Sequence, residues 1–122
     1  MNFFGVHTVI NRAELETMFE NMRTKSKWNV DGDLIWGFFF TDASRKKLEK
    51  AAKELGAMDY DFVGIFKDEE TQRFCWLHME KVETHTVDSI EKRNKELDAF
   101  AKKFGLESYD GMDASELLTD DE

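Results

Sequence analysis

The sequence predicts an α+β domain in which helices cover an antiparallel sheet. Apolar residues recur at helical spacing in two long stretches, and shorter stretches rich in aromatic and β-branched residues lie between them. A chain of 122 residues with 41% hydrophobic composition can bury one core without disulfides or a metal. We therefore expect one principal domain, with short segments on either side of it.

Two helices are predicted from their apolar stripes and their end signals. The first covers residues 44–55, with Asp42 before it as a suitable N-cap and Gly56 at its end. The second covers residues 87–104, and the pair Gly105–Leu106 predicts a Schellman ending in which the leucine folds back on the last turn. Both helices should bury one face and expose the other.

A further helix is predicted over residues 11–22. Asn11 and Glu14 have the spacing of a capping box, and one face of this helix carries Leu15, Met18, Phe19 and Met22. The chain is accordingly expected to divide into an N-terminal extension with this helix, a central domain and an acidic tail, at residues 1–33, 34–113 and 114–122.

Four strands are predicted, at residues 34–40, 60–66, 73–82 and 108–112. The polar residues 68–72 join the second and third strands into a hairpin. The resulting order, β-α-β-β-α-β, is that of the split βαβ or ferredoxin-like fold, an antiparallel sheet with two helices on one face. The last strand is expected at the edge of the sheet, with Gly111 at a bulge or a bend.

Both faces of this sheet should carry large apolar side chains. On the first strand Trp36, Phe38 and Phe40 share one face, and Phe39 lies on the other. Two helices can cover only one face. We therefore expect the N-terminal helix, or a second subunit in a homodimer, to cover the other.

The charge of the chain is unevenly distributed. The net charge is −9, and residues 107–122 hold seven acids and no Lys or Arg, which leaves −2 on residues 1–106. Phosphate would be repelled, so no direct contact with nucleic acid is expected, and a basic protein is the more suitable partner. A merely solubilising tail is the alternative. We expect a cytoplasmic protein that is not inserted in a membrane. The expectation rests on the lone Cys75, on an N-terminus unlike a secretory signal and on the lack of a long apolar run.

No residue pattern indicates catalysis, a metal or a cofactor. The cluster His78, Glu80, Glu83 and His85 lacks the spacing of known metal motifs. Cys75 and His78 are three residues apart on a strand, so they point to opposite faces and cannot form a nucleophile–base pair. The glycines are scattered and build no phosphate-binding loop. We expect a protein that is not an enzyme.

Two segments resemble elements of the RraB family, the regulators of ribonuclease E activity. They are Leu48-Glu49-Lys50-Ala51-Ala52 and the stretch "KKFGLESYDGMD", and in that family a similar "LEKAA" helix precedes a closing "(E/S)YDGW" element. The resemblance covers residues 34–113, with Met112 in place of the family's Trp. It implies a ferredoxin-like α+β fold and a non-enzymatic, acidic protein that binds ribonuclease E and restrains RNA processing.

The closing element is the candidate partner-binding site. Tyr109 would give apolar contact and a hydroxyl, Asp110 and Asp113 would face basic groups, and Gly111 would allow close backbone approach. The alternative is that Tyr109 packs against the second helix and that the two acids are solvated.

Two other functions are compatible with the sequence. A small acidic immunity or antitoxin protein would neutralise a basic toxin through the same kind of surface. A small-molecule-binding domain is the third possibility, although no set of polar residues converges to support it. The identity of the protein partner separates the first two functions.

Overall fold

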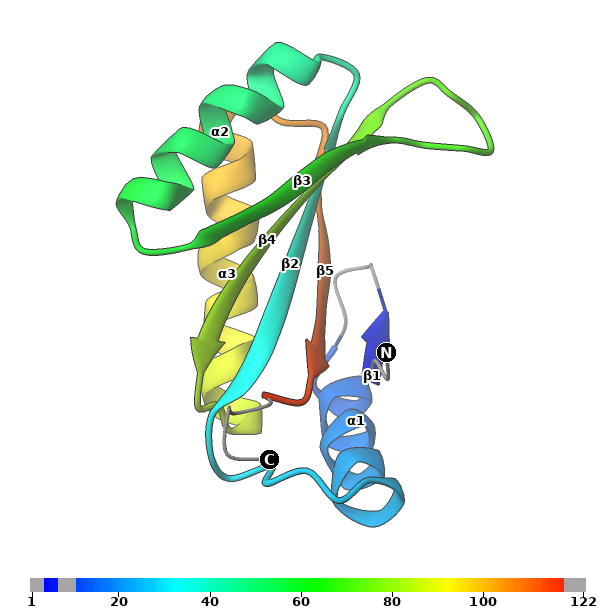
Figure 1. The fold of residues 1–122 in the computed structure, drawn as a ribbon, viewed down its shortest axis with the longest axis vertical. Helices are drawn as coiled ribbons and strands as arrows, with labels where there is room; N and C mark the ends of the chain where they lie inside the picture. The colour runs from blue at the N-terminus through cyan, green and yellow to red at the C-terminus, as the bar shows by residue number, and fades with distance from the viewer. Residues whose placement is uncertain (1–3, 7–10, 118–122) are drawn as a thin grey trace.

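The computed structural model describes residues 4–6 and 11–117, in which three helices are interspersed among five strands (Figure 1). In order, the elements of these residues are β1 (Phe4–Val6), α1 (Arg12–Lys25), β2 (Leu34–Asp42), α2 (Arg45–Ala57), β3 (Asp61–Lys67), β4 (Cys75–Glu83), α3 (Val87–Phe104) and β5 (Ser108–Ser115). No helix in this part of the chain is both long enough and apolar enough to cross a bilayer. The predicted helices and the predicted hairpin are all present.

The sheet has the order β1-β5-β2-β4-β3, and each pair of neighbouring strands is antiparallel. The α+β class and the antiparallel sheet are therefore confirmed. The order differs from a simple split β-α-β-β-α-β arrangement, because β1 adds a strand. Phe4 lies opposite Ala114 and Val6 opposite Met112, so β5 is not the edge strand that the sequence predicted. A three-residue strand with one valine carries too weak a pattern to be recognised in the sequence.

The predicted irregularity at Gly111 is confirmed. Phe39 lies opposite Gly111 and Phe40 opposite Tyr109, so Asp110 is an extra residue in β5. Gly111 has a φ of 105°, a backbone conformation that residues other than glycine rarely adopt. The bulge keeps Tyr109 and Met112 on the same face of the sheet although they are three residues apart.

All three helices pack on one face of the sheet (Figure 1). On that face the Trp36 ring lies 6.0 Å from Phe19 of α1, and Phe40 lies 6.0 Å from Phe100 of α3. Between them Phe38 meets Tyr60, which directly follows α2, at 5.7 Å. The expectation that the N-terminal helix covers the other face is therefore wrong.

The side chains of α1 account for this placement. Its buried residues Leu15, Met18, Phe19 and Met22 belong to the same hydrophobic core as the rest of the helix-covered face. Arg12 fixes the start of α1 beside α3 through ion pairs with Asp88 at 2.6 Å and Glu91 at 3.4 Å. The core is thus continuous across residue 33, where the sequence suggested a boundary.

The ends of α2 differ from the prediction. Ser44, not Asp42, is the N-cap, and its hydroxyl accepts from the Lys47 amide at 3.2 Å. At the other end Gly56 stays inside the helix, and Asp59 takes the left-handed conformation with a φ of 71°. Asp tolerates this region better than most residues do. Glycine adopts it still more readily, which is why the sequence favoured Gly56 as the end of the helix.

Asp42 instead joins three elements. It is 6% exposed at the end of β2. Its Oδ2 accepts from the Ser44 amide at 2.8 Å, and its Oδ1 accepts from the Glu107 amide at 2.9 Å. One buried carboxylate therefore fixes the start of α2 and the connection between α3 and β5.

Replacing Asp42 should destabilise the fold. In Asp42→Ala two amides lose a charged acceptor, and we expect the free energy of unfolding to fall by about 2–6 kcal/mol, at roughly 1–3 kcal/mol for each unsatisfied group. Asp42→Asn keeps one acceptor oxygen and should lose less. Urea denaturation measures both. Equal stability of Asp42→Ala and the parent would show that the two bonds contribute nothing.

Candidate functional site

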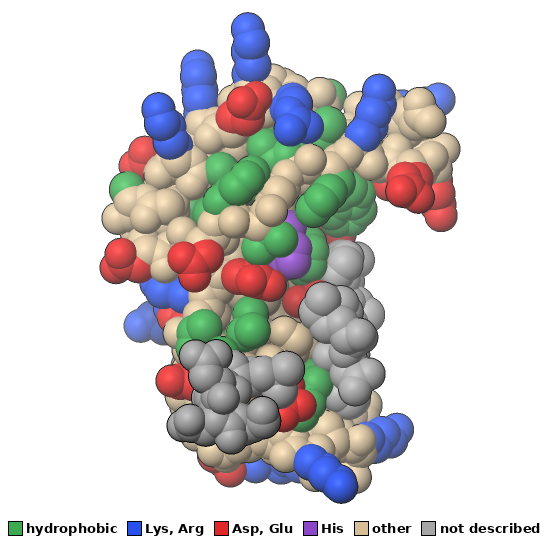
Figure 2. All heavy atoms as spheres, in the orientation of Figure 1, with side chains coloured by type: hydrophobic (Ala, Val, Ile, Leu, Met, Phe, Trp, Pro, Cys, Tyr) green, Lys and Arg blue, Asp and Glu red, His purple; other side chains and the backbone are tan. Residues whose placement is uncertain are grey.

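The sheet face away from the helices, which we call the open face, is the candidate site. Strand register assigns its side chains. They include Ile35, Gly37 and Phe39 of β2, Trp76, His78, Glu80 and Val82 of β4, Asp61, Gly64 and Phe66 of β3, and Gly111 and Asp113 of β5. Figure 2 looks onto this face.

Large apolar side chains are exposed around the open face. Among the described residues five large hydrophobic side chains are exposed, and four of them lie on β3 and β4. Phe66 is 51% exposed and Val82 is 45% exposed, and both point to the open face. In Figure 2 hydrophobic side chains gather in the upper part of the face and acidic ones below them. Such a combination is typical of protein-binding surfaces.

An acidic cluster occupies the middle of the open face. A Cβ on Gly37 would lie 2.5 Å from Asp113 Oδ1 and 2.9 Å from His78 Nε2, so both side chains converge over this glycine. His78 stacks on Phe39 with 4.4 Å between the ring centroids, and its Nε2 lies 3.7 Å from Glu80 Oε2. The absence of a side chain at Gly37 therefore lets carboxylates and an imidazole meet.

The electrostatics of this cluster favour a cation. Partial burial raises the pKa of Glu80, and the charges of Asp113 and Asp61 raise it further. The Glu80 side chain is still 32% exposed, so an incoming group can reach it. A Lys or Arg side chain placed here would relieve the repulsion between the three carboxylates.

The predicted residues of β5 are placed very differently from one another. Tyr109 is 2% exposed on the helix side, where its hydroxyl donates to Asn94 Oδ1 of α3 at 2.6 Å and burial raises its pKa well above the ordinary value. Gly111 is buried in the bulge and Asp110 is partly exposed. Asp113 is 3% exposed and joins the acidic cluster.

Sequence reasoning missed most of the residues that meet at this cluster. It weighed His78 and Glu80 as metal ligands, and His78 also as a base for Cys75, but it did not consider either as part of a docking surface. Among the described residues no group of three or more His, Cys, Asp or Glu is arranged to hold a metal ion. Gly37, Asp61 and Asp113 reach the cluster from three other strands, and no local pattern connects them.

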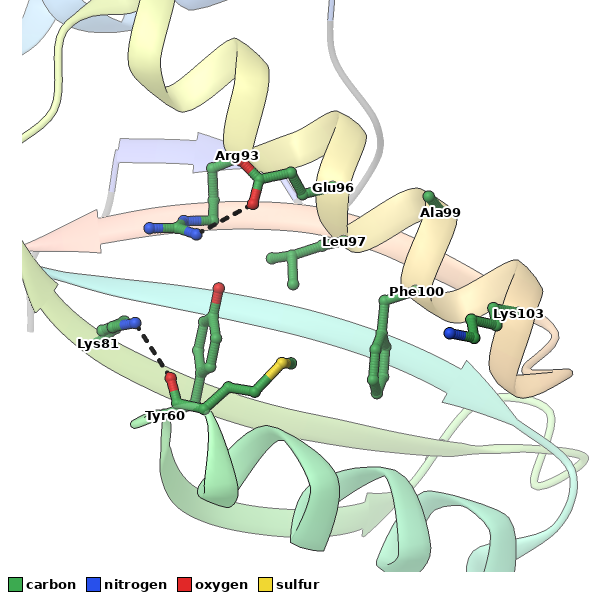
Figure 3. A pocket seen from close by; sticks show the side chains of 9 residues that line it. Tyr60, Lys81, Arg93, Glu96, Leu97, Ala99, Phe100 and Lys103 are labelled. Atoms are coloured by element: carbon green, nitrogen blue, oxygen red, sulfur yellow. Dashed lines mark hydrogen bonds and ion pairs between the residues drawn. The ribbon is translucent and has the colours of Figure 1, made fainter.

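A second hollow lies on the helix side, between the end of α2, β4 and α3 (Figure 3). Its volume is about 360 Å³. Lys81 donates to the Met58 carbonyl at 3.2 Å and lies 4.5 Å from the centre of the Tyr60 ring. Arg93 pairs with Glu96 at 3.4 Å. Both cations are therefore engaged by neighbouring groups of the fold, which favours a structural role.

A buried polar chain continues behind that hollow. The Glu83 carboxylate binds both Arg93, at 2.5 Å, and His85 Nε2, at 2.8 Å. His85 Nδ1 lies 2.8 Å from the Ser89 hydroxyl. Burial lowers the pKa of His85, against the influence of Glu83. Burial would raise the pKa of Glu83, but the hydrogen bond from His85 and the charge of Arg93 outweigh it and lower the value.

The comparison with family models decides the family. A model described as "RraB: Regulator of ribonuclease activity B" matches residues 12–114. The chain belongs to the RraB family. The match confirms the resemblance and extends it to α1, which the sequence comparison had left outside. No curated protein matches the chain. RraB proteins are regulators and not enzymes, which agrees with the expected lack of catalysis.

Replacing Tyr109 separates a core role from a docking role. Tyr109→Phe leaves the Asn94 carbonyl without its donor, so the free energy of unfolding should fall by about 1–3 kcal/mol. Denaturant titration measures this change. A stable variant whose partner binding is lost would instead support direct contact through the hydroxyl.

The His85 chain predicts a pH dependence of stability. Because the folded pKa of His85 is lowered, the unfolded chain takes up a proton below about pH 6.5 that the folded chain does not. Stability should therefore fall as the pH is lowered from about 7.5 to about 5.5, a range above the titration of Glu83. His85→Gln should flatten this part of the curve. An unchanged slope would contradict the role given to His85.

Proposed function

We propose that this protein restrains a ribonuclease of the ribonuclease E type by binding it as a protein partner through the open face. Membership of the RraB family supports regulation of a ribonuclease. The acidic cluster beside exposed apolar side chains is the observation that supports the surface. The protein would act in the cytoplasm, where RNA is processed.

The segment of the partner that fits this face is basic and partly aliphatic. Asp61, Glu80 and Asp113 bring three carboxyl groups together on this face, where burial raises the pKa of Glu80 and the charges of Asp113 and Asp61 raise it further. Val82 and Ile35, which lie opposite each other in the register, would contact the aliphatic part of the segment. Arg suits such a site, because its stem is apolar and its head binds carboxylates in a fork.

The candidate residues of β5 enter this proposal unequally. Asp113 contributes its charge to the cluster, and Asp110 offers a partly exposed carboxylate at the bulge. Tyr109 and Gly111 would hold these acids in place from within the strand. The docking role of the four residues is therefore carried by the two acids.

We also infer that β2 to β5 with α2 and α3 form a ferredoxin-like unit. The order β5-β2-β4-β3 and the antiparallel pairing of these strands support this comparison. Strand β1 and helix α1 would then be additions at one edge, which lengthen the sheet and extend the core.

The charge of Asp61 tests the proposal. Asp61 is exposed, so Asp61→Lys should hardly affect folding, but it should lower the association rate with purified ribonuclease E by about tenfold at low salt and weaken the salt dependence. Surface plasmon resonance measures association, and cleavage of a labelled single-stranded RNA measures inhibition.

Glu20→Lys is the matched control, because it makes the same charge change at an exposed site on α1. It should leave association almost unchanged. A similar loss in both variants would mean that net charge, and not the open face, governs binding. No inhibition of ribonuclease E by the parent protein would contradict the proposed function itself.

A further inference from the structure

The fold gathers basic charge at the end of the molecule formed by α2. This helix carries five basic residues, Arg45, Lys46, Lys47, Lys50 and Lys53, against the acids Glu49 and Glu54, a net of +3. The chain as a whole has a net charge of −9, so the remainder carries −12. Figure 2 shows Lys and Arg side chains standing along this end, above the acidic part of the open face.

Three of these cations form an exposed stripe that other described residues do not bind. Lys46, Lys50 and Lys53 are exposed, and none has a hydrogen-bond or ion-pair partner among the residues that the structure describes. They line a shallow hollow of about 430 Å³ together with Glu49. Their spacing places them on one face of α2 over about 10 Å, at 1.5 Å per residue. By contrast, Lys47 is held by the Gly105 carbonyl at 2.8 Å.

An exposed aromatic ring directly follows the residue of β3 that contacts the first turn of α2. Arg45 Nη1 donates to the Ile65 carbonyl at 3.5 Å, which brings the first turn of α2 against β3. The following residue, Phe66, points to the open face and is 51% exposed. Its ring leans over Gly64, where a Cβ would lie 2.8 Å from Phe66 Cζ. Arg45 thus links a row of ammonium groups to a ring that is accessible for stacking.

We propose that this surface binds single-stranded RNA. Phosphates would lie along Lys46, Lys50 and Lys53, with Arg45 at the turn, and an unstacked base would pack on Phe66. A row of cations beside an aromatic side chain is the combination by which proteins hold single strands without reading their sequence. The acidic turn at Glu69 and Glu70 limits the strand to the α2 side of the hairpin.

This inference goes beyond the regulation of a ribonuclease and concerns direct contact with RNA. The net charge of the whole chain predicts no contact with RNA. Positive charge is concentrated on α2, however, and we therefore infer RNA binding for this end of the molecule alone. A regulator that holds both a ribonuclease and a single-stranded RNA would act on the enzyme and its substrate together.

The test measures fluorescence anisotropy of a labelled single-stranded RNA of about 12 nucleotides, within the site sizes of single-strand binders. The full chain is titrated at salt concentrations from about 50 to about 200 mM. The triple variant Lys46→Gln, Lys50→Gln, Lys53→Gln should lose affinity at least tenfold at low salt. Its plot of log affinity against log salt should be shallower by about 2, at roughly 0.7 per phosphate contact.

Matched controls separate a site from general charge. Lys27→Gln, Lys92→Gln, Lys95→Gln removes the same charge from exposed lysines elsewhere and should bind like the parent. Phe66→Ala should weaken binding severalfold with an unchanged salt slope, whereas Phe62→Ala should have no effect, because Phe62 is similarly exposed but lies opposite Met79 of the helix side.

Three results would overturn the proposal. They are no binding by the parent at the lowest salt, equal losses in the two triple variants, and binding of an oligoglutamate peptide as tightly as RNA, which would indicate an acidic protein as the partner. None of these measurements includes a ribonuclease, so they fail or succeed independently of the proposed function.

Discussion

The row Trp36, Phe38 and Phe40 on β2 is the contact on which the rest of the structure depends. All three side chains are fully buried, and each meets an aromatic ring from a different part of the helical layer. Because alternate residues of a strand share a face, one strand fixes the positions of α1, α3 and the end of α2 at once. The hydrophobic effect thus places every helix on the same side.

This concentration of helices leaves the opposite face of the sheet without a helix in the part of the chain that the structure describes. Had α1 crossed to that face, Phe66 and Val82 would be part of a second core. Instead they remain about half exposed, and Gly37 lets Asp113 and His78 meet beside Glu80. Burial raises the pKa of Glu80, and the neighbouring carboxylates of Asp113 and Asp61 raise it further. A site that repels its own charges in the free protein gains more from a cationic partner than a relaxed one would.

Much of the fold was predictable from local signals. The capping box at Asn11, the Schellman ending at Gly105 and the bulge at Gly111 are all present, because each depends on backbone geometry within a few residues. The local predictions that were wrong concern residues that also interact with partners distant in the sequence. Asp42 suits an N-cap, but Ser44 takes that position, and Asp42 binds the distant Glu107 amide as well. Likewise β1 exists only because β5 offers it a pairing partner.

The candidate site was far less predictable. Tyr109 is a residue type that is common at interface centres. The extra residue Asp110 in the bulge, however, directs its side chain toward the core, where it binds Asn94. Asp61, Glu80 and Asp113 come from three strands, and their proximity follows from register, which no single segment encodes.

By itself the sequence determined the helices, the strands other than β1, the antiparallel class and the family resemblance, since these follow from periodicity and from short motifs. Only the tertiary structure decided which face of the sheet the described helices leave uncovered and how an overall acidic chain separates its charges into an acidic face and a basic helix. The physical reason is that both depend on the direction in which side chains point after distant strands have paired.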